Sequence, residues 1–254
     1  MSRLPTCFFV QICYYKVYLQ RHICICCALP ASRPCGEDGA SEEIMKNAID
    51  ALSSARLVPV VKIEEERDAL PVAKAILDGG ISVMEVTFRT PAAEKAVKEI
   101  FEKLPEMFVG AGTLLSTEQV KAAKNAGAKF FVSPGFNEKT ADFCKSEGLP
   151  FFPGIVTPSE LERALYRGFD HLKFFPAEAA GGVKMIKALS APYSGVKFMP
   201  TGGINLENLQ NYLALPSVFA CGGSFMISKK EIAKGNFESI TEAVKKAVGL
   251  INTL

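Results

Sequence analysis

The sequence has little of several features that mark particular classes of protein. No run of apolar residues approaches the ~18–20 that a transmembrane helix needs. The 29 basic and 27 acidic residues give a net charge of only +2, and no basic stripe is interleaved with aromatic residues. These absences argue against a membrane partner and against a nucleic-acid partner. A small-molecule function is therefore the class to examine first.

Cysteine is scarce in most of the chain. Six of the eight cysteines lie within the first 35 residues, and only Cys144 and Cys221 follow them. A disulfide framework would not leave the main body so bare, which predicts a reducing compartment and a cytoplasmic location. Neither of these two cysteines has a visible activating base. The early cluster Cys24, Cys26 and Cys27 lacks the C-x₂-C spacing of a zinc site, so we expect no metal.

The first forty residues differ from the rest. Residues 1–40 carry four basic and two acidic residues, which leaves residues 41–254 electrically balanced. Residues 1–40 show no sustained helical or strand period, and we expect a disordered or artefactual extension, with Met45 a natural first residue for the body. A targeting segment is the alternative, although Gln11 and Lys16 interrupt its apolar part. The prediction is an extension over 1–40 and one domain over 41–254.

From about residue 58, short β-rich runs alternate with segments whose apolar residues have helical spacing. Glycines occur where these helices should end. Eight such units predict a single (β/α)₈ TIM barrel. The alternative, an open doubly wound sheet, normally has a glycine-rich turn after its first strand, and residues 58–66 contain no glycine. The expected strands are Val58–Ile63, Val83–Arg89, Met107–Leu115, Phe130–Pro134, Pro150–Val156, His171–Pro176, Val196–Thr201 and Val218–Ser224.

In a barrel, chemistry gathers at the carboxyl ends of the strands. The second expected strand places Glu85, Thr87 and Arg89 on one face by its period of two. That face points into the barrel, where a charge is costly without a partner. Glu85 and Arg89 lie too far apart along the strand to serve only each other, so we expect Lys173 to pair with one and a bound anion with the other. A structural ion-pair network is the alternative.

Lys173 lies within the apolar run His171-Leu172-Lys173-Phe174-Phe175-Pro176. A lysine among such neighbours is poorly hydrated, which disfavours its ammonium form, and a neutral amine can form a Schiff base with a carbonyl. The alternative is a lysine at a strand end with its amine in water. His171 shares the inward parity of Lys173, but its place at the strand start favours a structural role.

Two glycine pairs follow the last two expected strands. They are Gly202-Gly203, after Thr201, and Gly222-Gly223, before Ser224. Loops at these places in barrel enzymes often bind phosphate through backbone N–H groups, and glycine lets the backbone approach the anion. We therefore expect a phosphate site here, whereas Gly181-Gly182 is more simply a loop that leads into a helix.

The motifs, in their order along the chain, resemble one known family. They are Glu85-Val86-Thr87-x-Arg89-Thr90, Gly110-Ala111-Gly112-Thr113, Ser133-Pro134-Gly135, Pro153-Gly154-Ile155, Lys173-Phe174-Phe175-Pro176-Ala177-Glu178, Gly181-Gly182-Val183-Lys184, Pro200-Thr201-Gly202-Gly203-Ile204 and Gly222-Gly223-Ser224. This set, over about residues 45–250, is similar to the bacterial 2-dehydro-3-deoxy-phosphogluconate aldolases, which also act as 4-hydroxy-2-oxoglutarate aldolases. Residues 1–40 match nothing in that family.

The resemblance implies a class I aldolase on a (β/α)₈ barrel, without metal or cofactor and usually a homotrimer, whose substrate is a small phosphorylated keto acid. It implies that Lys173 is the Schiff-base lysine and that Glu85 moves protons. The resemblance also implies that Arg89 and Thr113 bind the pyruvate carboxylate and that Pro134 and Phe175 form the walls of the pocket. It implies that the phosphate end of the substrate is bound by Thr201, Gly202, Gly203, Gly223 and Ser224.

The expected reaction yields pyruvate and glyceraldehyde 3-phosphate, and possible further cleavage of 4-hydroxy-2-oxoglutarate yields pyruvate and glyoxylate. Two alternatives stay open. One is an aldolase for the galactonate epimer of the substrate, which shares the lysine, glutamate and arginine. The other is a non-catalytic phosphate-binding barrel, which would need the glycine loops but would have no use for Lys173 or Glu85.

Overall fold

The computed structural model describes residues 38–253. Nearly all of the extension expected over 1–40 lies outside the described residues, so its nature stays a prediction. From Ala40 onward the chain forms one compact unit. Its first helix, α2 (Asp38–Ala55), already begins seven residues before Met45, and it was not among the elements expected from the sequence.

The strands form two parallel sheets. The larger has six strands in the order β5-β4-β3-β2-β1-β9, and the smaller has three in the order β6-β7-β8. Every strand pairing in both sheets is parallel. The strands are β1 (Leu57–Val61), β2 (Val83–Thr87), β3 (Phe108–Gly112), β4 (Phe131–Val132), β5 (Phe151–Phe152), β6 (Gly154–Ile155), β7 (His171–Phe174), β8 (Lys197–Pro200) and β9 (Cys221–Gly223).

All eight expected strands are present, but each is shorter than expected and the fifth is divided. The sequence predicted one strand over Pro150–Val156, whereas the structure has β5 before Pro153 and β6 after it. Proline has no N–H to donate to a ladder. β5 pairs with β4, and β6 pairs with β7 on the other side, so the division separates the two sheets. Isolated bridges connect the β8 and β9 regions, Phe198 with Val218 and Thr201 with Gly222.

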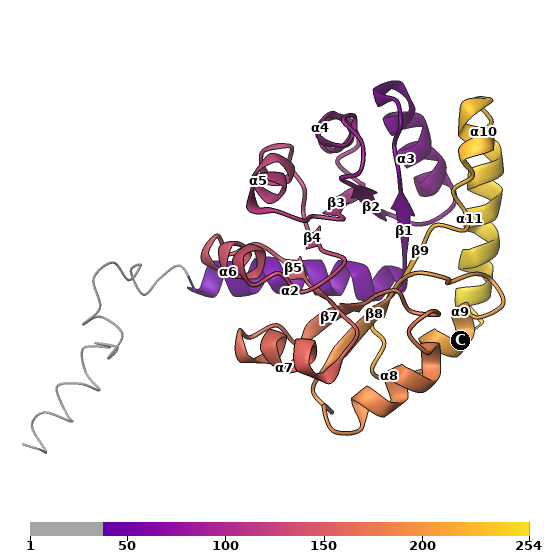
Figure 1. Ribbon diagram of the computed structural model, residues 1–254. Helices are drawn as coiled ribbons and strands as arrows, with labels where there is room; N and C mark the ends of the chain where they lie inside the picture. Colours follow the sequence, from indigo (N-terminus) through magenta and orange to yellow (C-terminus); the bar gives the residue numbers. More distant parts are fainter. Residues whose placement is uncertain (1–37, 254) are drawn as a thin grey trace, which may run out of the picture. The chain divides into compact units, whose positions relative to one another are not determined.

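Helices lie around the outside of the strands (Figure 1). Their bounds are α3 (Ala69–Asp78), α4 (Ala93–Lys103), α5 (Thr117–Asn125), α6 (Glu138–Ser146), α7 (Pro158–Tyr166), α8 (Gly182–Ser190), α9 (Leu209–Leu213), α10 (Lys229–Ala233) and α11 (Glu238–Ile251), with a short 3₁₀ turn, η2 (Glu66–Asp68), before α3. Capping residues and glycines explain where several of these helices begin and end. Ser116 caps α5, Thr157 and Glu160 form a capping box on α7, and Gly80, Gly127, Gly148 and Gly168 follow helices with positive φ.

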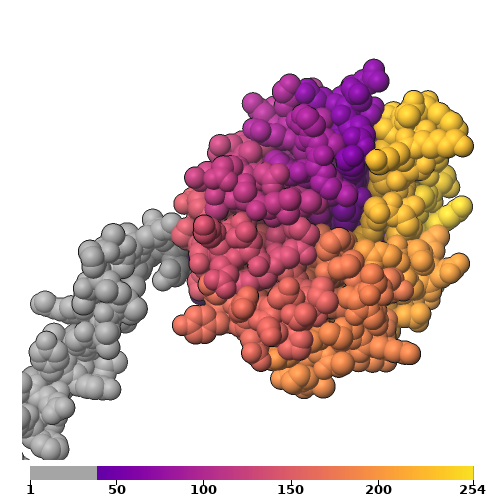
Figure 2. Space-filling view, in the orientation of Figure 1, coloured from indigo at the N-terminus to yellow at the C-terminus, as the bar shows by residue number. Residues whose placement is uncertain are grey.

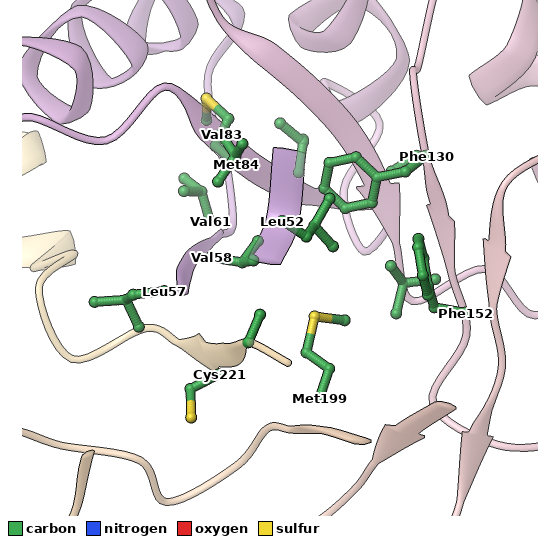
Figure 3. Packing of buried hydrophobic residues seen from close by; sticks show 14 of the residues in the cluster. Leu52, Leu57, Val58, Val61, Val83, Met84, Phe130, Phe152, Met199 and Cys221 are labelled. Atoms are coloured by element: carbon green, nitrogen blue, oxygen red, sulfur yellow. The ribbon is translucent and has the colours of Figure 1, made fainter. Parts of the chain in front are cut away.

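The core lies between the strands and the surrounding helices. Leu52 of α2 lies near Val58 and Phe130 in the core, and the ring of Phe152 lies beside that of Phe130, with centroids 6.4 Å apart (Figure 3). Met199 belongs to the same cluster. All five side chains are fully buried. The first and last parts of the unit lie side by side, β1 against β9 and α3 against α11, which Figure 2 shows as indigo beside yellow. The strand ends are therefore held on one rigid scaffold.

Between residues 38 and 253, no helix combines the length and the apolar character that crossing a membrane requires.

Candidate active site

The centre of the site is a contact between Lys173 and Glu85. Lys173 lies on β7 between two fully buried side chains and is itself only 4% exposed. Its Nζ lies 3.4 Å from Oε1 of Glu85, which projects from the middle of β2 in the other sheet. The same Nζ lies 5.4 Å from the centroid of the Phe175 ring. The sequence predicted that Lys173 would pair with one of Glu85 and Arg89, and strand parity brings it to Glu85, across 88 residues of chain.

The two carboxylate oxygens of Glu85 differ, because Oε1 contacts Lys173 and Oε2 does not. The side chain is fully buried, and its Oε2 has no hydrogen-bond partner among residues 38–253. A buried carboxylate oxygen without a partner is costly, so this atom calls for a water or a ligand group. Gly112 on β3 lies directly against the carboxylate, because a Cβ at that position would overlap Glu85. The sequence motif contained Gly112, but nothing in it indicated this contact.

Arg89 and Thr113 lie on the neighbouring loops after β2 and β3. β2 ends at Thr87, so Arg89 lies just beyond the strand and not within it as predicted, because its backbone N–H turns back to the carbonyl of Thr87 at 2.8 Å. The Arg89 side chain is exposed, and we find no ion pair for it within the part of the chain that the structure describes. Thr113 has a φ of +57°, which is a rare conformation for a β-branched residue. Such local strain is concentrated at functional sites.

Gln119 connects these two loops. Its Oε1 accepts a hydrogen bond from the Leu115 N–H at 2.7 Å, and its Nε2 donates to the Phe88 carbonyl at 3.4 Å. One side chain therefore contacts the residue before Arg89 and the loop that follows Thr113. Nothing local in the sequence indicates this role of Gln119, because the contact with Phe88 spans 31 residues.

Pro134 and Phe175, which the resemblance gives as pocket walls, are half-buried at the ends of β4 and β7. The carbonyl of Pro134 packs against Gly154, where a Cβ would overlap it. Phe175 has a second neighbour besides Lys173, since a Cβ on Gly202 would lie 3.3 Å from its ring. Phe175 thus lies between the lysine and the first glycine loop.

The two glycine loops lie next to each other. Thr201 and Gly222 form a parallel bridge, which places Gly202-Gly203 beside Gly223-Ser224. Gly202 and Gly203 have φ values of +98° and +84°, which only glycine adopts readily. Within residues 38–253, no acceptor is found for the backbone N–H groups of Gly202, Gly203 and Ser224. Free N–H groups in a glycine-rich turn suit an anion.

The other reactive residues stay outside this group. His171 lies at the start of β7, where its Nδ1 is 2.8 Å from Asp170 Oδ1 and its ring packs edge-on against Phe219. Burial raises the pKa of the Cys144 thiol to about 12, and burial also raises the pKa of Cys221. Neither cysteine is a thiolate at neutral pH, which is consistent with the absence of an activating base in the sequence.

The chain is similar to known proteins over most of its length. Residues 48–243 match the family model described as KDPG and KHG aldolase. A 2-dehydro-3-deoxy-phosphogluconate aldolase of Treponema pallidum is 45% identical over 83% of this chain and 100% of its own length. The KHG/KDPG aldolase of Escherichia coli is 41% identical over 80% of this chain and 98% of its own.

Among solved structures, the KDPG aldolase of Legionella pneumophila, with pyruvate captured at low pH as a covalent carbinolamine intermediate, superposes with a TM-score of 0.76. It is 41% identical, and the match covers 78% of this chain and 97% of that one. The family model covers well over half of the chain, and the relatives are matched over nearly their whole length. The resemblance drawn from the motifs is thereby confirmed, and the chain belongs to the KDPG and KHG aldolase family.

Proposed function

We propose that this protein is a class I aldolase that cleaves 2-dehydro-3-deoxy-6-phosphogluconate to pyruvate and glyceraldehyde 3-phosphate through a Schiff base on Lys173. The observation that carries the proposal is a buried lysine amine 3.4 Å from a fully buried carboxylate that has a second oxygen free. A non-catalytic phosphate-binding protein would have no use for this costly buried pair.

Lys173 is the nucleophile in this reaction. Its ammonium gives a proton to Glu85, and the resulting amine attacks C2 of the keto acid, which gives a carbinolamine. Glu85 returns the proton to the carbinolamine hydroxyl, which leaves as water, and an iminium ion remains. The iminium withdraws electrons from the C3–C4 bond, so that bond can break and leave an enamine on the lysine. Protonation of the enamine at C3 and hydrolysis of the resulting iminium then release pyruvate and restore the amine.

Glu85 moves the protons. As a carboxylate it takes the proton of the C4 hydroxyl while the C3–C4 bond breaks, and the C4 oxygen leaves as the aldehyde. The protonated acid then returns a proton to C3 of the enamine, directly or through a water. The free Oε2 supports this role, because one oxygen can face the lysine while the other faces the substrate.

The two ends of the substrate have different binding groups. The pyruvate carboxylate is held by Arg89, whose exposed guanidinium can form a paired hydrogen bond with it, and by Thr113. The phosphate is held by the loops of Gly202-Gly203 and Gly223-Ser224, with Thr201 beside them. Pro134 and Phe175 form the walls between these ends.

The carboxylate end is common to 4-hydroxy-2-oxoglutarate, and we propose that this compound is cleaved too, to pyruvate and glyoxylate. The galactonate epimer of the phosphorylated substrate is the remaining alternative. Rates on the two epimers decide between them, and an equal or reversed preference would contradict the choice of the gluconate form.

Three further expectations, on barrel closure, oligomeric state and location, accompany this proposal. The bridges between the β8 and β9 regions support closure of the strands into a (β/α)₈ barrel. A homotrimer is proposed from the family resemblance alone, and sedimentation of the purified protein tests it. The cytoplasmic location rests on the lack of paired cysteines after residue 35 and stays a prediction.

Borohydride reduction in the presence of pyruvate tests the mechanism. We expect a covalent adduct on the peptide that contains Lys173. Lys173→Arg should abolish the adduct, because a guanidinium stays protonated and forms no imine. Lys197→Arg, on the neighbouring strand β8, is the matched control and should leave trapping unchanged. No adduct, or an adduct on another lysine, would refute the mechanism.

A further inference from the structure

A hydrogen bond between a buried tyrosine and an exposed glutamate lies behind the first glycine loop. The hydroxyl of Tyr212, a fully buried residue of α9, donates to Oε1 of Glu178. Burial, together with the hydrogen bond to Glu178, raises the pKa of Tyr212, so the hydroxyl keeps its proton as a donor. Neither residue contacts Lys173 or Glu85 by any interaction found between residues 38 and 253. The catalytic pair therefore does not account for this bond.

Glu178 is fitted tightly against the glycines of two loops. A Cβ on Gly203 would overlap the Cβ and Cγ atoms of Glu178. A Cβ on Gly182 would come within 2.9 Å of the Tyr212 hydroxyl and 3.1 Å of the Glu178 carboxylate. Both glycines have positive φ. The side chain of Glu178 thus fills the space behind the Gly202-Gly203 turn, and Tyr212 holds its outer end.

Backbone bonds connect the same segments. The Glu178 N–H donates to the Gly202 carbonyl at 3.1 Å, and the Ala177 N–H donates to the Thr201 carbonyl at 2.8 Å. These bonds use the carbonyl groups of Thr201 and Gly202, whereas no protein acceptor is found within residues 38–253 for the N–H groups of Gly202 and Gly203. The side chain of Glu178 and these backbone bonds therefore contact the turn while its N–H groups stay free.

From this arrangement we propose that Tyr212 and Glu178 are positioning residues that hold the Gly202-Gly203 turn in its anion-binding conformation, and that they set the preference of the enzyme for phosphorylated keto acids. The inference rests on the proposed function of the same site. It adds that phosphate recognition depends on a hydrogen bond that does not touch the phosphate. A carboxylate beside an anion site would repel the anion, and the bond to Tyr212 keeps the charge of Glu178 behind the turn.

The test separates the phosphate end from the reacting end. In Tyr212→Phe we expect KM for 2-dehydro-3-deoxy-6-phosphogluconate to rise about 10-fold, the size of a hydrogen bond to a charged group. The pyruvate concentration that gives half-maximal borohydride trapping on Lys173 should not change, because pyruvate has no phosphate. Inhibition by inorganic phosphate should weaken by a factor similar to the rise in KM.

Three further variants make the result specific. Glu178→Gln keeps an acceptor for the Tyr212 hydroxyl and should retain most of the phosphate preference, whereas Glu178→Leu should lose it. The double variant Tyr212→Phe/Glu178→Leu should be no worse than Glu178→Leu alone if both residues act through one bond. Tyr193→Phe is the matched control, since Tyr193 donates to Glu162 at 2.7 Å elsewhere on the surface, and it should change nothing.

The outcomes distinguish the two proposals. Wild-type enzyme that forms no pyruvate adduct defeats the proposed function itself. If wild type traps pyruvate, two results overturn the positioning role. One is an unchanged KM in Tyr212→Phe. The other is an equal rise in KM and in the pyruvate concentration that gives half-maximal trapping. A rise in KM for the phosphorylated substrate and weaker inhibition by phosphate, with unchanged pyruvate trapping, support the positioning role.

Discussion

The two ends of the site differ in how they can hold an anion. At the proposed carboxylate end, the loops after β2 and β3 offer the charged side chain of Arg89 and the hydroxyl of Thr113. At the proposed phosphate end, the loops 201–204 and 222–225 contain no lysine or arginine and offer backbone N–H groups. A long charged side chain can adjust to its ligand, but a backbone turn binds only in the right conformation. The first end should therefore be sensitive to charge and the second to backbone shape.

The largest effect is expected midway between the two ends, at Glu85. Glu85→Gln removes the group that accepts the C4 hydroxyl proton, and we expect kcat to fall about 10²- to 10⁴-fold. Because the proton transfer is common to both substrates, 2-dehydro-3-deoxy-6-phosphogluconate and 4-hydroxy-2-oxoglutarate should lose equally in steady-state assays.

Glu99→Gln is the control for this change, since Glu99 is also paired with a lysine, Lys103, at 2.7 Å, but on the surface of α4. A kcat for Glu85→Gln within a few-fold of wild type would remove Glu85 from the chemistry.

The next effect tests the carboxylate end. Arg89→Ala removes a charged hydrogen bond worth about 1.5–3 kcal/mol, which corresponds to a rise in KM of about 10- to 150-fold. The same factor should appear for both substrates and for the half-saturation of pyruvate trapping, because all three have the same carboxylate. Arg163→Ala, an exposed arginine of α7, should leave these values unchanged. A rise for the phosphorylated substrate alone would instead place Arg89 at the phosphate end.

A smaller and more selective effect is expected at the phosphate end. Gly203→Ala puts a side chain at a φ of +84° and against Glu178, and a left-handed conformation costs a non-glycine residue about 1–2 kcal/mol. We expect KM to rise about 5- to 30-fold for the phosphorylated substrate, with 4-hydroxy-2-oxoglutarate hardly affected. Gly195→Ala, which has open space around it, is the control. Equal losses on both substrates would show that the turn supports the whole site and not the phosphate end.

The same contrast explains what the sequence could predict. Charged residues on inward strand faces predicted that Lys173 would have a charged partner, because a charge on such a face is costly without one, and the structure shows its contact with Glu85. The binding role of Arg89 stays a prediction. The sequence also located all eight expected strand regions and several helix ends, because capping residues and glycines act locally.

The remaining features depend on contacts between distant segments. The division of the fifth strand has a local signal in Pro153, but the neighbours on which its two halves pair are distant in sequence. The fit of Gly112 against Glu85 leaves no local signal. Helix α2 precedes the repeating pattern, so the alternation of strands and helices did not include it. The bond between Tyr212 and Glu178 joins residues 34 apart, and no spacing rule indicates it.

The smallest effect is predicted at Gln119. Its hydrogen bonds to the backbone of Leu115 and Phe88 connect the two loops of the carboxylate end, so this end also depends on backbone position. Gln119→Glu keeps the acceptor for the Leu115 N–H, but the carboxylate cannot donate to the Phe88 carbonyl. Loss of one neutral hydrogen bond of about 0.5–1.5 kcal/mol predicts a rise in KM of about 2- to 10-fold, equal for the two substrates and for pyruvate trapping. Gln210→Glu, which loses similar donor bonds to Leu250 and Thr253 far along the chain, is the control. If Gln119→Glu has no effect, the position of Arg89 does not depend on the loop behind it, and the contrast between an adjustable side chain and a fixed backbone becomes sharper. If its effect exceeds that of Gly203→Ala, both ends depend on backbone position and the contrast is wrong.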